Sequence, residues 1–141
     1  MVRVPRIEPG SDAISHTIDI RVRFGDTDAA GIVYYANYLR YFESGRAEFM
    51  RALAMPYSEI VKDGYILPVV EAWCRYRAPA VYDDLLQVHT WLHEHKAASL
   101  LIGCHIRRGD TLLAEGATRI GSMRADGTPC RLPPQLRKWK P

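Results

Sequence analysis

Two acidic residues, Asp26 and Asp28, lie in a segment that reads FGDTDAAGIVYYANY and runs from Phe24 to Tyr38. A turn of small residues ending in Gly31 follows the acids, and a helix is expected to begin near the end of the segment. A carboxylate held beside a glycine turn and a helix start can act as a base or a nucleophile on a polarised carbonyl. Free N–H groups in the first helical turn can hold the oxyanion that develops. This segment is the first candidate for a catalytic site.

The two acids are assigned different roles. An aspartate in a turn is most simply a turn residue, and Asp26 is expected to hydrogen-bond the loop backbone and to fix the position of Asp28. Asp28 lies beside Gly31 and the aromatic pair Tyr34-Tyr35, and this combination favours catalysis over turn capping. The two tyrosine side chains fit packing as well as they fit the lining of a pocket.

Length and composition set the class of protein. The chain has 141 residues, of which 48% are hydrophobic and 25% charged, and its formal net charge is +3. These values indicate one globular domain with a real core and show no nucleic-acid signature. No apolar run approaches the length of a membrane span. Three cysteines, far apart and outside any CxxC pair, predict reduced thiols in a cytoplasmic protein.

The chain is divided into two parts. Residues 1–15 contain prolines, Gly10 and Ser11 with little periodicity, and they are predicted to form a loose N-terminal extension. Residues 16–141 are predicted to form the folded domain. The basic cluster at Arg137–Lys140 is interpreted as a solvated C-terminus rather than as a binding arm.

Hydrophobic periodicity predicts a strand and then a helix around the acidic turn. Residues 16–24 alternate between apolar and polar side chains, as in a half-buried strand. From Asn37 the period changes to three and four residues, which is typical of an amphipathic helix. Asn37 is expected to cap this helix. Pro56 ends it, and residues 57–62 are predicted to form a short second helix.

Four further alternating segments predict a sheet. They are Leu67–Ala78, Leu85–His95, Ser99–Arg107 and Thr111–Arg124. Short connections with turn residues between them imply antiparallel neighbours. One apolar sheet face and one helix with an apolar stripe must cover each other, and a long twisted sheet is expected to curl around the helix.

This order of elements, with the motif D-x-D-x-x-G-[IV]-V-x-Y-x-N-Y between Asp26 and Tyr38, resembles the hotdog-fold acyl-CoA thioesterases. The resemblance is strongest to the 4-hydroxybenzoyl-CoA thioesterase-like group and runs from about His16 to about Arg124. It implies an α+β fold in which a long antiparallel sheet wraps around a central helix. It also implies hydrolysis of an acyl-CoA thioester to a free acid and CoA, with no metal and no cofactor, by a homodimer or homotetramer.

The resemblance also implies site residues. The second acid of the motif, here Asp28, is the catalytic carboxylate, either as nucleophile or as general base on water. The backbone N–H at the helix entrance, here that of Tyr35, polarises the thioester carbonyl. Gly31 lets the chain approach closely at the turn, and a partner subunit is expected to line the pocket.

Basic residues for the CoA phosphates are less well marked. The aroyl-CoA type carries a basic cluster after the second long strand, where this chain keeps only Lys96. Lys96 is therefore the candidate phosphate contact, and Arg107 and Arg108 are further candidates, because such contacts need only positioned cations. The alternative for all three is a solvated hairpin end.

Three histidines, His89, His93 and His95, fall on one face of a predicted strand and suggest a metal site. Carboxylates and cysteines are missing from the pattern, so an exposed sheet surface or a subunit contact is the favoured interpretation. Trp91 lies on the same face, and an exposed tryptophan there would indicate packing against another dimer.

Two other functions fit the same fold. A hydratase or dehydratase of acyl thioesters would need a well-placed histidine beside the carboxylate, where this chain has Tyr35. A non-catalytic acyl-CoA-binding module would bind CoA esters without turnover, and it usually carries an added domain for which this chain has no room.

Overall fold

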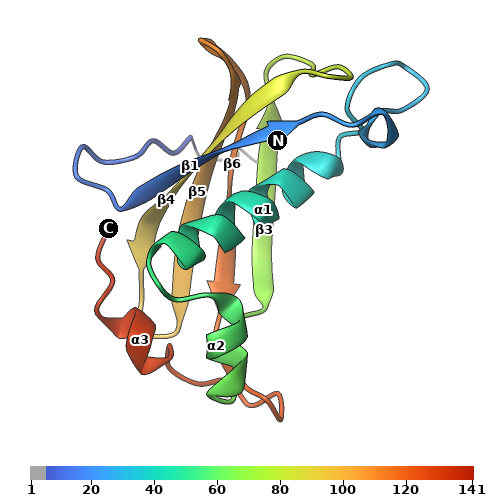
Figure 1. Cartoon of the computed structure of the whole chain (residues 1–141). Helices are drawn as coiled ribbons and strands as arrows, with labels where there is room; N and C mark the ends of the chain where they lie inside the picture. Colours follow the sequence, from blue (N-terminus) through green and yellow to red (C-terminus); the bar gives the residue numbers. More distant parts are fainter. Residues whose placement is uncertain (1–5) are drawn as a thin grey trace, which may run out of the picture.

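The computed structural model describes residues 6–141, in which one long helix lies against the concave face of a curved sheet (Figure 1). Five strands form the sheet in the order β1-β4-β5-β6-β3, and every neighbouring pair is antiparallel. Their bounds are β1 Ser15–Arg21, β3 Val69–Tyr76, β4 Leu85–His95, β5 Ser99–Arg108 and β6 Thr111–Gly121. The predicted strands and their antiparallel order are confirmed.

The helix α1, Asn37–Ala52, packs its apolar stripe onto the inner face of the sheet. The stripe residues Tyr38, Tyr41, Phe42, Phe49 and Met50 are buried. They join two clusters that include Val88 and Leu92 of β4 and Ile120 of β6, among other side chains. Because one helix and one sheet face bury each other, the helix start has a fixed place at the edge of the core.

Smaller elements complete the domain. A 3-10 helix, Phe24–Asp26, follows β1, and the predicted short helix is present as α2, Tyr57–Lys62. The 3-10 helix, the strand β2, Tyr65–Ile66, and the helix α3, Pro134–Arg137, were not predicted. β2 pairs with β7, Met123–Arg124, whose residues were predicted as the end of the last long strand. Among residues 6–141 no helix is long and apolar enough to cross a membrane.

The C-terminal segment is not a solvated tail, so that prediction was wrong. Trp139 is buried, and its ring meets Phe49 of α1 edge-on with 5.7 Å between ring centroids. Leu132 and Leu136 belong to the same cluster. The charges of the flanking basic residues hid this contact in the sequence, because the segment alternates single apolar anchors with exposed side chains.

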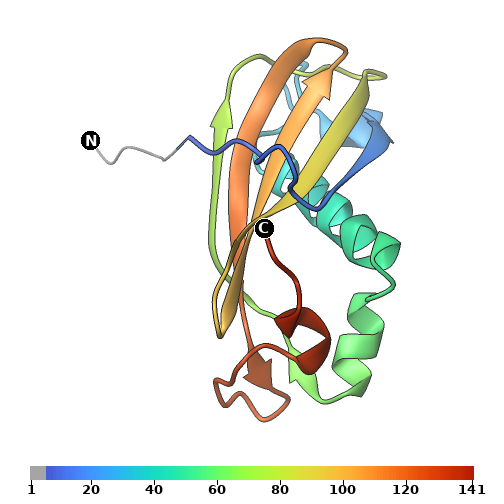
Figure 2. The same ribbon diagram turned by 90° about the vertical axis from the view of Figure 1, so that its left-hand side faces the viewer.

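The outer face of the sheet is covered in part by the chain's own N-terminal segment. Figure 2 shows this segment crossing the strands on the side away from α1. Residues 6–14 contain no helix or strand, yet Ile7 is buried and packs with Trp91, Leu101 and Ala117. Residues 1–5 of the predicted extension lie outside the described residues.

Candidate active site

The loop that carries the two acids is tied to the rest of the domain by backbone hydrogen bonds. The Val22 N–H donates to the Asp84 carbonyl, and the Val33 N–H donates to the Ala80 carbonyl, each at 2.9 Å. Thr27 and Val33 form an isolated β-bridge across the loop. Both ends of the loop are therefore held against the connection between β3 and β4.

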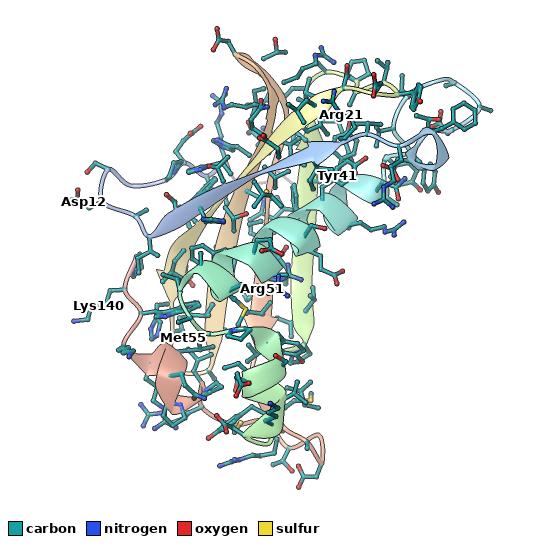
Figure 3. All side chains as sticks on the ribbon, in the orientation of Figure 1. Asp12, Arg21, Tyr41, Arg51, Met55 and Lys140 are labelled. Atoms are coloured by element: carbon teal, nitrogen blue, oxygen red, sulfur yellow. The ribbon has the colours of Figure 1, made fainter. Side chains whose placement is uncertain are left out.

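Asp26 holds this loop from within, as the sequence predicted. One carboxylate oxygen, Oδ2, accepts hydrogen bonds from the Arg23 N–H at 3.0 Å and from the Tyr41 hydroxyl at 2.9 Å. Its backbone carbonyl accepts from the Tyr34 N–H and from the Asn37 side-chain amide, each at 2.9 Å. Figure 3 shows Tyr41 on α1, on the side where Arg21 ends β1. Burial and the bond to Asp26 both raise the pKa of the Tyr41 hydroxyl, so it stays protonated as a donor.

The side chain of Asp28 accepts fewer hydrogen bonds than the side chain of Asp26. Its Oδ1 accepts a hydrogen bond from the Ala30 N–H at 2.8 Å, and its own N–H and carbonyl bond Ile32 and Gly31 across the turn. Within residues 6–141 the other oxygen, Oδ2, has no hydrogen-bond partner. The residue is exposed in this chain. One oxygen thus orients the carboxylate while the other is available for chemistry.

Gly31 has a conformational role in the turn. Its φ is +82°, in the left-handed region that residues with a Cβ rarely adopt. The Gly31 N–H donates to the Asp28 carbonyl at 2.9 Å, which closes the turn. A residue with a side chain here would strain the backbone that carries Asp28.

The start of α1 differs from the prediction in one respect. The N-cap position is Ala36, not Asn37, and the Asn37 side chain bonds the Asp26 carbonyl instead of capping the helix. The predicted cap was wrong because the Asn37 side-chain amide donates to the loop backbone, whereas a cap would accept an N–H of the first helical turn.

Two backbone N–H groups remain unpaired at this helix start. The Asn37 N–H donates to the Tyr34 carbonyl at 2.9 Å, and the Tyr38 N–H donates to the Tyr35 carbonyl at 3.4 Å. In a trans peptide the N–H points opposite to the preceding carbonyl, so the N–H groups of Tyr35 and Ala36 point away from the helix. Neither makes a hydrogen bond within the described part of the chain. The family resemblance implied a role for the Tyr35 N–H, and the turn geometry adds the unpaired Ala36 N–H.

Asp28 and Tyr35 line the same cavity, which has a volume of about 410 Å³. The other lining residues are mostly apolar or aromatic: Ile32, Val33, Tyr38, Tyr76, Arg77, Ala78 and Pro79. A second cavity of about 520 Å³, between β1 and α1, is lined by Asp26 and several polar residues but not by Asp28. The loop therefore separates its two acids into two different environments.

Lys96 does not lie near this cavity in the same chain. It follows the end of β4 and forms an ion pair with Glu94 at 3.2 Å, whereas the Asp28 loop bonds residues just before the start of β4. Eleven residues of strand separate the two ends, roughly 35 Å at the usual rise. Gly31, Asp28 and Tyr35 are brought together, and Lys96 is not. Of the further candidates, Arg108 is paired with Asp84 at 2.7 Å.

The three histidines do not converge. His89 and His93 flank Trp91, whose indole N–H donates to the Nδ1 of His93 at 3.2 Å. A β-bulge between Leu92 and Glu94 reverses the alternation, so His95 turns the other way and bonds the Leu136 carbonyl at 2.9 Å. The prediction that all three share one face was wrong. Within residues 6–141 no group of His, Cys, Asp and Glu side chains could hold a metal ion.

Trp91 is not exposed, so the argument that it packs against another dimer fails. It is fully buried between its histidine neighbours, Gly103 and the N-terminal segment. The outward position on the strand was correct, but the sequence did not show that residues 6–14 cover it.

Comparison with known proteins places the chain in a family. It matches the model of the thioesterase-like superfamily over residues 22–140. The acyl-CoA thioesterase YbgC of Haemophilus influenzae is 33% identical over 102 residues, which cover 72% of this chain and 75% of that protein. The 4-hydroxybenzoyl-CoA thioesterase of a Pseudomonas species is 33% identical over 92 residues, which cover 63% of this chain and 65% of that protein. The solved structure of the gentisyl-coenzyme A thioesterase BH1999 has a TM-score of 0.81 at 31% identity and covers 86% of this chain and 99% of that one.

The five-stranded antiparallel sheet around one long helix is the hotdog fold, here with an acid-bearing loop at the helix start. The chain belongs to the thioesterase-like superfamily. The predicted fold class and the predicted resemblance to 4-hydroxybenzoyl-CoA thioesterases are both confirmed.

Proposed function

We propose that this protein hydrolyses an acyl-CoA thioester to a free carboxylic acid and CoA, with Asp28 as the catalytic carboxylate. The observation that carries the proposal is that Asp28, with one uncommitted oxygen, lines the same cavity as Tyr35, whose backbone N–H is unpaired. Membership in a family of thioesterases supports the reaction class.

The reaction follows from these groups. The thioester carbonyl oxygen accepts a hydrogen bond from the Tyr35 N–H at the positive end of the α1 dipole, which stabilises the negative charge that develops there. Asp28 then acts in one of two ways. It either takes a proton from the attacking water, or it attacks the carbonyl carbon itself and forms a mixed anhydride that water hydrolyses. In both cases CoA leaves as the thiolate and is protonated. On the general-base route the acyl carbon gains the water oxygen. On the nucleophilic route it keeps an Asp28 oxygen, because water attacks the aspartyl carbon of the anhydride and supplies the new carboxylate oxygen.

The active form is a homodimer joined along β3, or a homotetramer built from such dimers. β3 is an edge strand, and Val69, Val70 and Tyr76 at its two ends are about half exposed. An exposed apolar edge strand is a template for pairing with a second chain. Antiparallel pairing of two copies of β3 would bring the Val69 end of one copy beside the Tyr76 end, and thus the cavity, of the other.

Such a dimer gives Lys96 a role that it cannot have in one chain. The β4–β5 turn and the start of β3 lie at the same end of the sheet, because the Gly121 N–H bonds the Pro68 carbonyl and Ser99 pairs with Gly121. That end of the second copy would face the cavity of the first, where the lysine can contact a CoA phosphate. A cytoplasmic location, where acyl-CoA is available and thiols stay reduced, completes the proposal.

A thiol-release assay tests the function. Wild-type protein is assayed against short, long and aromatic acyl-CoAs, together with Asp28→Asn. The amide keeps the size of the side chain but removes the base and nucleophile, so kcat should fall about a thousandfold or more, with unfolding by urea unchanged. Asp12→Asn is the matched control, since Asp12 is exposed in a turn at the opposite end of the molecule (Figure 3). Near wild-type hydrolysis by Asp28→Asn would refute the assignment.

The same screen separates the two rival functions. A hydratase would consume enoyl-CoA with loss of the enoyl absorbance and without release of a thiol. A binding module would bind acyl-CoA, which calorimetry would detect, and it would release no thiol from any ester. Single-turnover hydrolysis in H₂¹⁸O then distinguishes the two roles of Asp28, because only the nucleophilic route places ¹⁸O in its carboxylate.

A further inference from the structure

A tyrosine of the edge strand contacts the backbone turn that precedes α1. The Tyr76 hydroxyl, at the end of β3, donates a hydrogen bond to the Tyr35 carbonyl at 2.8 Å. The two residues are 41 positions apart in the chain. The Tyr76 ring is fixed by edge-on contacts with Tyr38, at 5.1 Å between centroids, and with Tyr35, at 6.5 Å. The hydroxyl therefore has a defined place relative to the turn.

The peptide unit that receives this bond belongs to the helix start. Its carbonyl also accepts the Tyr38 N–H, but at 3.4 Å that helical bond is long and weak. The Tyr76 bond is the shorter of the two, and so it is the stronger restraint on the orientation of the Tyr35–Ala36 peptide. The N–H of the same peptide is that of Ala36, one of the two unpaired donors at the cavity end of α1.

We infer that Tyr76 is a positioning residue for the oxyanion hole, which it orients and polarises through the Tyr35–Ala36 peptide, and that Ala36 supplies the second donor. The inference rests on the proposed thioesterase function. A carbonyl that accepts a hydrogen bond makes the N–H of its own peptide a better donor. A peptide plane held at its carbonyl by two hydrogen bonds also needs no reorganisation when the oxyanion forms.

Tyr76 has the properties that this role requires. Burial, followed by the nearby Cys74 thiol, raises the pKa of its hydroxyl to about 12, so the group remains a donor throughout the neutral range. It does not contact the reacting atoms in this arrangement, because its hydroxyl is engaged by the Tyr35 carbonyl. Because it sits on β3, it would also connect the proposed subunit contact to the oxyanion hole.

The test compares Tyr76→Phe with Tyr57→Phe in the full-length protein. Both changes remove one hydroxyl that is bonded to backbone, since the Tyr57 hydroxyl accepts the Leu67 N–H at 3.3 Å on the other side of the domain. Tyr76→Phe should lower kcat about tenfold with less than a twofold change in KM, because the oxyanion forms only in the transition state. The shape of the pH–rate profile should not change. Tyr57→Phe should retain wild-type kcat.

Three results would overturn the inference. They are an unchanged kcat in Tyr76→Phe, an effect confined to KM, and loss of the alkaline limb of the pH profile, which would make the hydroxyl a general acid instead. Sedimentation of both variants shows whether the dimer persists; a fall in kcat that is fully explained by dissociation also contradicts it. If wild-type protein hydrolyses no thioester, the proposed function fails first. If Asp28→Asn is inactive while Tyr76→Phe is normal, only the positioning role fails.

Discussion

Two regions of this molecule gather titratable side chains, and they treat them in opposite ways. On the outer face of the sheet, His105 and Glu115 are buried below 5% exposure under the N-terminal segment. Arg6 and Arg77 both approach the Glu115 carboxylate, and Glu8 lies 3.7 Å from His105. At the start of α1, Asp28 is exposed, and one of its carboxylate oxygens has no hydrogen-bond partner among residues 6–141.

If Asp28 is the catalytic group, as proposed, burial alone does not locate chemistry in this fold. The outer cluster is buried, and its ion pairs hold the N-terminal segment to the sheet. The Asp28 loop is restrained through its backbone and through Asp26. These contacts leave the Asp28 carboxylate accessible. Rigid backbone with an open side chain is the arrangement that a catalytic group needs.

The first prediction concerns a substitution that disrupts packing on the outer face of the sheet and leaves the Asp28 loop unchanged. A Cβ at Gly103 would lie 2.3 Å from the nearest atom of the Trp91 ring, and that ring is fully buried and cannot move aside. Gly103→Ala should therefore lower the free energy of unfolding by about 3 kcal/mol, measured by urea denaturation. Turnover of the folded protein should stay near wild type. Gly10→Ala, with nothing within 4 Å of its Cβ, is the control and should change stability by less than about 0.5 kcal/mol. Equal stability of the two variants would show that the outer face tolerates repacking.

The second prediction loosens the loop from within. Tyr41→Phe removes the buried hydroxyl that donates to Asp26, which should cost about 1.5 kcal/mol of stability because the acceptor is charged. The carboxylate of Asp28 would lose some of its restraint, so kcat should fall by about fivefold. Urea denaturation and thiol release measure the two effects. Lower stability with normal kcat would mean that Asp26 holds the loop but does not position Asp28.

The third prediction concerns acid. Burial lowers the pKa of His105, which Glu8 only partly offsets, so the folded protein resists its protonation. The folded pKa lies below the unfolded value of about 6.5. The stabilisation is therefore complete above pH 6.5 and is lost as the pH falls through the folded pKa.

Urea denaturation between pH 7.5 and pH 5 should show this loss, and His105→Gln should make the dependence shallower. The remaining dependence should come mainly from His89, whose pKa is also lowered by burial. A variant with the same pH dependence as wild type would exclude His105 as its source.

The fourth and smallest effect tests the far end of the sheet. Lys96→Ala should raise KM for acyl-CoA by about threefold through loss of a phosphate contact, with kcat unchanged. Stability should change by less than about 0.5 kcal/mol, because the ion pair with Glu94 is exposed. Lys62→Ala removes a similar exposed pair, with Glu59 on α2, and should leave KM at the wild-type value. A KM equal to wild type in both variants would leave Lys96 as a solvated hairpin residue.

The strands, α1 and the acidic loop were predictable because each follows from local pattern. Alternation identifies β1 and β4, and the three- and four-residue period identifies α1. The motif around Asp28 contains its own turn chemistry in Gly31. These features need no knowledge of distant residues.

The remaining features depend on contacts between residues far apart in the chain. Burial of Trp91 requires the N-terminal segment, burial of Trp139 requires Phe49, and the turn of His95 requires a bulge in β4. The unpaired Ala36 N–H was missed because it depends on which backbone N–H groups form the hydrogen bonds of the first turn of α1. The bond from Tyr76 to the Tyr35 carbonyl joins elements 41 residues apart, and no local pattern marks it.

The cysteines have a practical consequence for any assay of this protein. Burial raises the pKa of the Cys74 thiol to about 11 and raises that of Cys104 further still. Disulfide reagents such as Ellman's react with thiolates, so both side chains should be slow to consume the dye. These two thiols should therefore add little background to the colour that released CoA produces.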